Sequence, residues 1–142
     1  MPILLDTDHL SVLQLQEHPA TLHLQARINP LPPQDIHVAI VSFQEQARGW
    51  LAYIHRARKP ADVLRGFQFL QNMLADFSAR NVLPFDQAAM SEFLNLKQQR
   101  IRIGTSDLRI AAIVKVNGLK LLSRNLRDFR QVPGLDVEDW TV

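Results

Sequence analysis

The chain has 142 residues, of which 46% are apolar and 21% charged, and none is cysteine. This length and composition fit one domain over residues 1–142 that buries its own core. The absence of cysteine excludes disulfides, thiolate metal sites and cysteine nucleophiles, and no apolar run approaches the ~18 residues of a membrane-spanning helix. We therefore expect a cytoplasmic protein that does not enter a membrane.

The net charge is only +2, but its distribution is uneven. Between Lys97 and Arg130 nine basic residues accompany two acidic ones, a local charge of +7, and the rest of the chain carries −5. Contacts from lysine and arginine to phosphates supply most of the sequence-independent affinity for nucleic acids. The pattern favours a face that binds a polyanion, and a solvated helix face is the alternative.

The N-terminal quarter reads as strand, helix, helix and loop. A short apolar strand is predicted at residues 3–5, and Thr7 and Asp8 after it are residue types that cap helices. The helical pattern that follows is carried by Leu10, Leu13 and Leu15. A second helix is predicted at residues 20–28. It must end before the proline-rich stretch 29–33, because proline lacks an amide donor and restricts its predecessor.

The middle of the chain predicts a strand and a pair of helices. Residues 36–41 are rich in β-branched side chains and predict a strand. Ser42 would then cap a helix with Glu45 at the third helical position, the spacing of a capping box. A proline-containing break near residue 59 divides the helical pattern, so residues 42–80 predict a helical hairpin. Core or interface positions are expected at Leu13, Leu22, Phe67, Leu70, Leu74 and Phe77.

The last third continues the alternation of strands and helices. Two more short strands are predicted, at residues 82–85 and 120–123. Asp86 is expected to cap a helix, and Thr105 or Ser106 to cap a strongly apolar helix over residues 108–116. Such alternation predicts an α/β fold with a mainly parallel sheet and right-handed crossovers.

Four short acidic stretches lie at the ends or starts of these apolar elements. They contain Asp6, Glu45, Asp107 and Asp128. Ligands of open parallel sheets bind beyond the carboxyl ends of the strands, where Asp6, Glu45 and the turn 123–128 are all expected. Mg²⁺ and Mn²⁺ prefer hard oxygen ligands collected in this way. The pattern therefore predicts a divalent-metal site and favours phosphodiester chemistry.

Four sequence blocks, in order and over essentially the whole chain, carry a resemblance to a known family. They are Leu4-Leu5-Asp6-Thr7, Val41-Ser42-Phe43-Gln44-Glu45 with Gly49, residues 103–112, and residues 123–129 leading to Val132-Pro133-Gly134-Leu135. On these residues the chain resembles the PIN-domain ribonucleases, in particular the VapC-like toxins of bacterial type II toxin–antitoxin modules. The resemblance implies a three-layer α/β/α domain with a short central sheet. It also implies an Mg²⁺- or Mn²⁺-dependent endoribonuclease that cleaves RNA, binds a cognate antitoxin and forms a homodimer.

The resemblance also implies roles for individual acids. Asp6, Glu45 and Asp107 match the three acids of the family's metal site. Asp6 and Asp107 are the expected metal ligands, whereas Glu45 is expected to act through metal-bound water or a second ion. Flanking phosphates are expected to contact the nearby basic side chains Arg109, Arg124 and Arg127.

The fourth acidic position departs from the simplest family pattern, a Thr-x-Asp triplet. Here the triplet is Ser123-Arg124-Asn125. Asn125 can coordinate or hydrogen-bond through its carbonyl oxygen but brings no charge, so Asp128 is expected to supply the fourth carboxylate. Ser123 would orient a water or a ligand through its hydroxyl, or serve as a cap or turn residue.

Each acid also has a purely structural explanation. Asp6 and Asp8 could cap a helix, Glu45 could complete a capping box, and Asp107 could be a favourable charge at a helix N-terminus. Asp8 and His9 are expected to be structural or peripheral.

Two other functions compete with the nuclease. A non-catalytic PIN-like RNA-binding or interaction module would explain the replacement of an acid by Asn125. The segment Asp6-Thr7-Asp8 is also similar to the start of haloacid-dehalogenase-like phosphatases, in which the first aspartate is a nucleophile and the second an acid. That motif departs at Leu10, and the paired acids expected after a later strand are missing.

Overall fold

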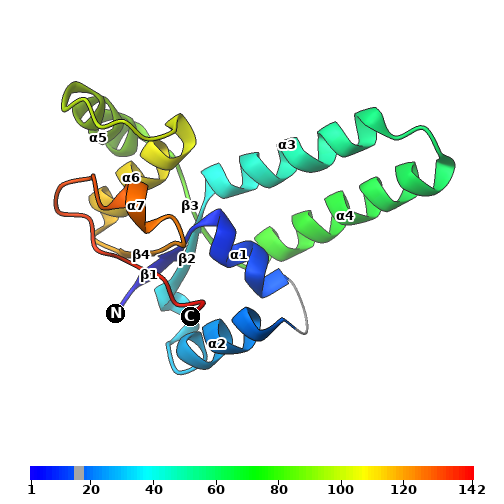
Figure 1. Ribbon diagram of the computed structural model, residues 1–142, viewed down its shortest axis with the longest axis horizontal. Helices are drawn as coiled ribbons and strands as arrows, with labels where there is room; N and C mark the ends of the chain where they lie inside the picture. Colours follow the sequence, from blue (N-terminus) through cyan, green and yellow to red (C-terminus); the bar gives the residue numbers. More distant parts are fainter. Residues whose placement is uncertain (15–17) are drawn as a thin grey trace.

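A five-stranded parallel sheet forms the centre of the molecule in the computed structural model, which describes residues 1–14 and 18–142 (Figure 1). The strand order is β3-β2-β1-β4-β5. The bounds are β1 (Ile3–Leu5), β2 (Ile36–Ala39), β3 (Asn81–Leu83), β4 (Lys120–Leu122) and β5 (Val137–Glu138). Every pairing is parallel, which confirms the predicted α/β class.

Helices connect the strands. They are α1 (Thr7–Gln14), α2 (Pro19–Ile28), α3 (Ile40–Arg56), α4 (Pro60–Ser78), α5 (Gln87–Gln98), α6 (Thr105–Asn117) and α7 (Leu126–Phe129), with a short 3-10 turn at Pro33–Asp35. Asp86 caps α5 as predicted, since its Oδ1 accepts a hydrogen bond from the Ala89 amide at 3.0 Å. Leu15, part of the predicted helical pattern, lies outside the described residues.

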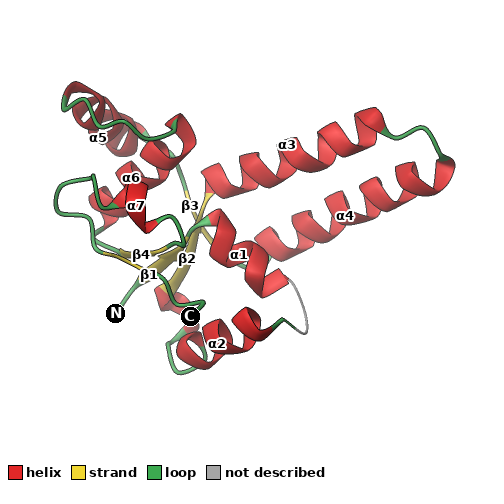
Figure 2. Cartoon of the chain, viewed as in Figure 1, coloured by secondary structure: helices red, strands yellow, loops and turns green. Residues whose placement is uncertain are grey.

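Alternate residues of the strands build two cores. Leu4 and Leu121 pack with α5 and α6 on one face of the sheet. Ile3, Leu5 and Leu122 pack with α1, α2 and α4 on the other. Successive side chains of a strand point to opposite faces, so continuous apolar runs such as residues 3–5 are buried on both sides. Figure 2 shows the two helical layers, which confirm the predicted three-layer α/β/α arrangement.

α3 and α4 form an antiparallel hairpin that extends away from the sheet (Figure 1). Trp50 and Phe69 stack between the helices with ring centroids 4.5 Å apart. Gly66 permits the close approach, because a Cβ there would lie 2.5 Å from Cγ1 of Ile54. Of the expected core or interface positions, Phe77 is buried.

Several of the other expected positions are not core. Leu22, Phe67 and Leu74 are 67%, 56% and 57% exposed, so the core alternative is wrong for these three. Leu51 of α3 and Leu64 of α4 are exposed as well. The hairpin therefore exposes large apolar side chains, among them Leu51, Leu64, Phe67 and Leu74.

The start of α3 differs from the prediction. The strand ends at Ala39 rather than at residue 41, and Ala39 is the N-cap of α3. Ser42 therefore lies inside the helix and Glu45 in its second turn, so the predicted capping box is wrong. The β-branched run favours a strand locally, but the chain must turn where β2 leaves the sheet.

Three other boundaries also differ. α6 begins at Thr105 with Gly104 as N-cap, so the predicted caps at Thr105 or Ser106 are wrong. α1 likewise starts at Thr7 itself, and β3 ends at Leu83 rather than at residue 85. α7 and β5 were not predicted, because elements of four and two residues are too short to show a periodicity.

Among the helices of the described residues, none combines the length and the apolar character that crossing a membrane requires.

Candidate functional site

The register of the sheet brings Asp6 and Ser123 together. Leu5 of β1 pairs with Leu122 of β4, so the residues that follow these two strands are neighbours at the carboxyl edge. The Asp6 amide donates to the Leu122 carbonyl at 2.9 Å. The Ser123 hydroxyl donates to Oδ2 of Asp6 at 2.7 Å, and the Thr7 amide donates to Oδ1 at 2.8 Å. Both oxygens of the buried Asp6 carboxylate are therefore held.

Thr7 positions the Glu45 carboxylate at the same edge. Its hydroxyl donates to Oε1 of Glu45 at 2.8 Å and lies 2.8 Å from the Ser42 hydroxyl. A hydroxyl has one hydrogen to donate, so Ser42 in turn donates to Thr7. Glu45 thus reaches the end of β1 through α1, not through a cap of its own helix. The sequence analysis did not assign Thr7 a role in the site, although Thr7 directly follows Asp6 at the end of the first predicted strand.

Asn125 bridges the remaining two acids. Its Nδ2 donates to Oδ2 of Asp107 at 3.2 Å and to Oδ2 of Asp128 at 3.0 Å. Asp107 lies in the first turn of α6, and Asp128 lies in α7. An amide carries two hydrogens, one for each carboxylate, and an aspartate at this position could donate neither. The residue that departs from the family pattern therefore links the two acids beside it.

The electrostatics show that these acids share one environment. Burial, and after it the negative charge of Asp8, raises the pKa of Asp6 from its ordinary 3.8 to about 7, against opposing hydrogen bonds from Ser123 and Thr7. Burial and then the charge of Glu45 raise the pKa of Asp107, with further contributions from Asp128 and Asp8. A cation at this edge would relieve both effects.

The acids do not form a closed cage. Within residues 1–14 and 18–142, no three His, Cys, Asp or Glu side chains are grouped closely enough to hold a metal ion as they stand. The donors available are all oxygens, from Asp6, Glu45, Asp107 and Asp128. Mg²⁺ is commonly bound through one or two carboxylates and several waters, so an open set of oxygen donors with raised pKa values fits a hard divalent cation.

The three candidate arginines lie around the site without pairing to it. The Arg109 guanidinium lies 5.6 Å from the centroid of the Phe93 ring, and the Arg124 and Arg127 side chains are exposed. In the part of the chain that the structure describes, no ion pair joins any of the three to the acids. Their contact with phosphates stays a prediction.

Asp8 and His9, expected to be structural or peripheral, are bonded into the site. Asp8 Oδ2 accepts from the Arg124 amide at 2.9 Å and lies 3.3 Å from the Ser123 hydroxyl. Its Oδ1 lies 2.8 Å from Nδ1 of His9, which is fully buried. The sequence signal that could have indicated this role is the adjacency of Asp8 and His9 shortly after a predicted strand.

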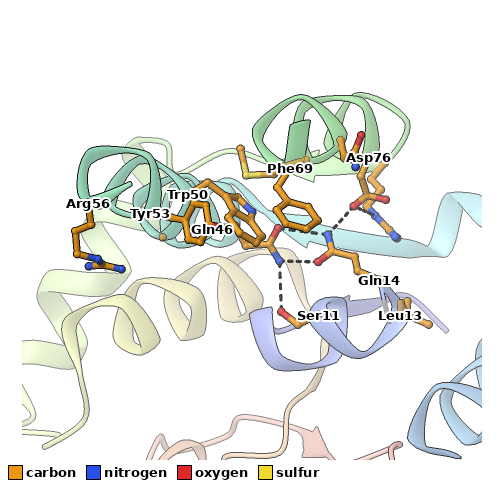
Figure 3. A pocket seen from close by; sticks show the side chains of 13 residues that line it. Ser11, Leu13, Gln14, Gln46, Trp50, Tyr53, Arg56, Phe69 and Asp76 are labelled. Carbon is orange, nitrogen blue, oxygen red and sulfur yellow. Dashed lines mark hydrogen bonds and ion pairs between the residues drawn. The ribbon is translucent and has the colours of Figure 1, made fainter. Parts of the chain in front are cut away.

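A groove with a cavity of about 900 Å³ lies beside the site, between α1, α3 and α4 (Figure 3). Trp50 and Phe69 form its aromatic side. Across from them, the Gln14 amide donates to Gln46 at 3.3 Å and to Asp76 at 3.1 Å. Gln46 directly follows Glu45 on α3, so consecutive residues of this helix belong to the groove and to the acidic edge.

A short parallel sheet lies between two helical layers, and acids from α3, α6, α7 and the turn after β1 meet at its carboxyl edge. This arrangement matches the three-layer fold that the resemblance to PIN domains implied. Comparisons with known proteins specify the type. The chain is 46% identical over 43 residues to ribonuclease VapC1 of Rickettsia felis, which is 30% of this chain and 32% of that protein. It is 34% identical over 73 residues to ribonuclease VapC2 of Haemophilus influenzae, 48% of this chain and 55% of the relative.

The chain thus matches about a third to about half of the length of these curated relatives. No family model matches it. Among solved structures, VapBC-1 from nontypeable Haemophilus influenzae aligns over 100% of both chains with a TM-score of 0.76 and 20% identity. DNA-bound VapBC from Salmonella typhimurium aligns over 99% of this chain and 98% of that chain, with a TM-score of 0.72 and 22% identity. The fold and the local sequence matches confirm the resemblance to VapC-like PIN domains.

Proposed function

We propose that this chain is an Mg²⁺- or Mn²⁺-dependent endoribonuclease and the toxin of a toxin–antitoxin pair. The observation that carries the proposal is the convergence of Asp6, Glu45, Asp107 and Asp128 from separate elements at one edge of the sheet, with the pKa of two of them raised. The matched relatives are named ribonucleases, which supports the reaction class.

Asp6 and Asp107 are the proposed cation ligands. A bound divalent ion lowers the pKa of a coordinated water and neutralises charge that develops on the phosphate. Ser123 and the Thr7 amide keep the Asp6 carboxylate oriented. The Thr7 hydroxyl keeps Glu45 at the edge, where it acts through solvent. Water would attack the phosphorus of the RNA backbone, the bond from phosphorus to one ester oxygen would break, and the proton lost by the water would pass through solvent to that leaving oxygen.

The role of the other polar side chains follows from their positions. Asn125 holds Asp107 and Asp128 with one neutral amide, which supports Asp128 as the proposed fourth carboxylate. We assign contacts with the flanking phosphates to Arg109, Arg124 and Arg127, which lie in the most basic part of the chain.

The proposed partner is an antitoxin that docks in the groove. Several solved neighbours are VapBC structures, and one is described as a member of the VapBC family of toxin–antitoxin systems. The aromatic side formed by Trp50 and Phe69 offers apolar contact, and Gln46 places the groove next to Glu45. A segment bound there would reach the acidic edge. We further propose a cytoplasmic homodimer, with the exposed apolar residues of the hairpin at its interface.

The nuclease is tested with purified protein and a panel of structured RNAs, in Mg²⁺ or Mn²⁺ and in EDTA. Asp107→Asn is the site variant, and Asp62→Asn, the same chemical change at a partly exposed acid of α4 far from the site in the sequence, is the matched control. We expect metal-dependent cleavage that is lost in EDTA and in Asp107→Asn but kept in Asp62→Asn. Binding of RNA without cleavage would support the non-catalytic module instead.

The phosphatase alternative predicts that Asp6 attacks a substrate directly. Both oxygens of Asp6 accept hydrogen bonds, and the residue is only 5% exposed, which does not favour a nucleophile. Hydrolysis of a small phosphomonoester by the same protein would revive that alternative.

A further inference from the structure

His9 is a buried histidine with a defined partner for each ring nitrogen. The Trp140 backbone amide donates to Nε2 at 3.1 Å. An amide can only donate here, so Nε2 accepts, and Nδ1 carries the hydrogen that Oδ1 of Asp8 accepts at 2.8 Å. The ring therefore connects the C-terminal end of the chain to α1 across 131 residues of sequence.

The C-terminal segment 139–141 is itself held in a defined turn. Oδ1 of Asp139 accepts from the Thr141 amide at 2.8 Å and from the Thr141 hydroxyl at 2.6 Å. The Trp140 side chain is buried, with the Arg27 guanidinium 4.4 Å from its ring centroid. These contacts fix the direction in which the Trp140 amide points, which is toward His9.

Asp8 transmits this anchoring to the loop after β4. While its Oδ1 is held by His9, its Oδ2 accepts from the Arg124 amide at 2.9 Å. The same oxygen lies 3.3 Å from the Ser123 hydroxyl. Asp8 is thus held through both carboxylate oxygens, one bonded to the His9 ring and the other to the loop that carries Ser123.

Ser123 is the point at which two carboxylates compete. Its hydroxyl lies 2.7 Å from Oδ2 of Asp6 and 3.3 Å from Oδ2 of Asp8, and it has one hydrogen. Since Arg124 and His9 already satisfy Asp8, the hydrogen goes to Asp6. An Asp8 side chain released from His9 would be free to turn and take that hydrogen, and Asp6 would lose the bond that orients it.

We propose that Asp8, His9 and the segment 139–141 form a positioning relay that fixes Ser123 and, through it, the Asp6 carboxylate. His9 and Asp8 are positioning residues and touch neither substrate nor cation. The kinetic consequence of the relay rests on the proposed nuclease function, whereas its effect on the loop after β4 does not. A histidine that only filled the core would contribute to stability without affecting Ser123 or Arg124.

The test compares three variants of the full chain. His9→Leu removes both hydrogen bonds of the ring, and His9→Gln restores a side chain that can donate and accept. Leu96→Ala, a fully buried position of α5 away from the relay, is the control for loss of stability alone. Thermal melting confirms that the control is at least as destabilised as His9→Leu.

Three measurements follow for each variant: exchange of the Arg124 amide hydrogen by NMR, Mn²⁺ affinity by titration calorimetry, and kcat and KM for RNA. In His9→Leu we expect the exchange of the Arg124 amide hydrogen to become about tenfold faster and kcat to become about tenfold lower. A factor of about ten is what the loss of one hydrogen bond allows. Mn²⁺ affinity should fall, with KM for RNA nearly unchanged. His9→Gln should recover most of each loss, and Leu96→Ala should keep wild-type Arg124 exchange and Mn²⁺ affinity.

Wild-type Arg124 exchange and Mn²⁺ affinity in His9→Leu would overturn the relay, as would the same losses in Leu96→Ala. The proposed function fails separately, if the wild-type protein cleaves no RNA with either metal. In that case Arg124 exchange and Mn²⁺ titration still decide whether the relay exists.

Discussion

Replacement of Asp6 by asparagine should stabilise the metal-free protein at neutral and basic pH while it abolishes cleavage. Asp6 is 5% exposed, and the pKa of its carboxyl group is raised to about 7, mainly by burial and then by the charge of Asp8. In the unfolded chain the same group titrates near its ordinary 3.8. The folded state therefore binds this proton more tightly than the unfolded state does.

The direction of the pH dependence follows from that difference. Below the unfolded pKa the group is protonated in both states and costs nothing. Between pH 3.8 and about pH 7 the folded state retains the proton that the unfolded state has lost, so the free energy of unfolding falls as the pH rises. Above this window the loss is complete, and at 1.36 kcal/mol for each pKa unit it amounts to about 4 kcal/mol.

Asparagine has nearly the same shape and no charge, so it escapes this penalty. It must reverse or lose one of the two hydrogen bonds that Asp6 accepts, at a cost of about 1 kcal/mol. In EDTA the Asp6→Asn variant should thus be more stable than the wild type by about 3 kcal/mol at pH 8, and the gain should shrink toward acid pH.

Urea denaturation at several pH values between 5 and 8 measures the difference directly. Asp62→Asn, at a partly exposed position, should follow the wild type at every pH to within about 0.5 kcal/mol. Added Mn²⁺ should stabilise the wild type and leave Asp6→Asn unchanged. The reasoning is refuted if Asp6→Asn is less stable than the wild type at pH 8, or if the difference does not grow with pH.

Three further predictions concern the site and the hairpin. Thr7→Val removes the hydroxyl that holds Glu45, and RNA cleavage should slow about tenfold at unchanged KM. Thr7→Ser keeps a hydroxyl and should retain the wild-type rate. Equal cleavage rates for all three proteins would contradict this role of Thr7. Asn125→Asp adds charge between two acids and should lower the stability of the metal-free protein by about 1–2 kcal/mol while Mn²⁺ affinity rises. Melting with and without Mn²⁺ tests this, and a more stable metal-free variant would exclude it. Phe67→Glu should weaken self-association in sedimentation experiments. The melting temperature should not fall, since Phe67 is 56% exposed. An unchanged dimer would place the interface elsewhere.

Much of the architecture is encoded locally and could be predicted. Apolar runs bounded by caps and prolines indicated four of the five strands and most of the helices. The parallel sheet then followed from the alternation, and so did the expectation that acids after strands would meet at one edge. The structure confirms the α/β/α arrangement, and the charges of Asp6, Glu45 and Asp128 each interact with that of Asp107.

Other features depend on contacts between residues that are distant in the sequence. The run 36–41 has strand propensity throughout, but it changes to helix at Ile40 because the sheet ends there. Whether Phe67 and Leu74 belong to a core depends on what covers α4, and the described residues leave both exposed. The partner of Glu45 is Thr7, 38 residues away, rather than the neighbouring Ser42 that the local spacing indicated.

The sequence by itself determined the fold class, the sites of the strands and the acidic composition of one sheet edge, because periodicity and residue type act over a few neighbouring positions. Only the tertiary structure decided which oxygens are held by Ser123, Thr7 and Asn125, and that the buried His9 connects the C-terminus to the site. Hydrogen bonds have preferred directions and tolerate variations in length of only a few tenths of an ångström, and the packing of the whole chain sets both.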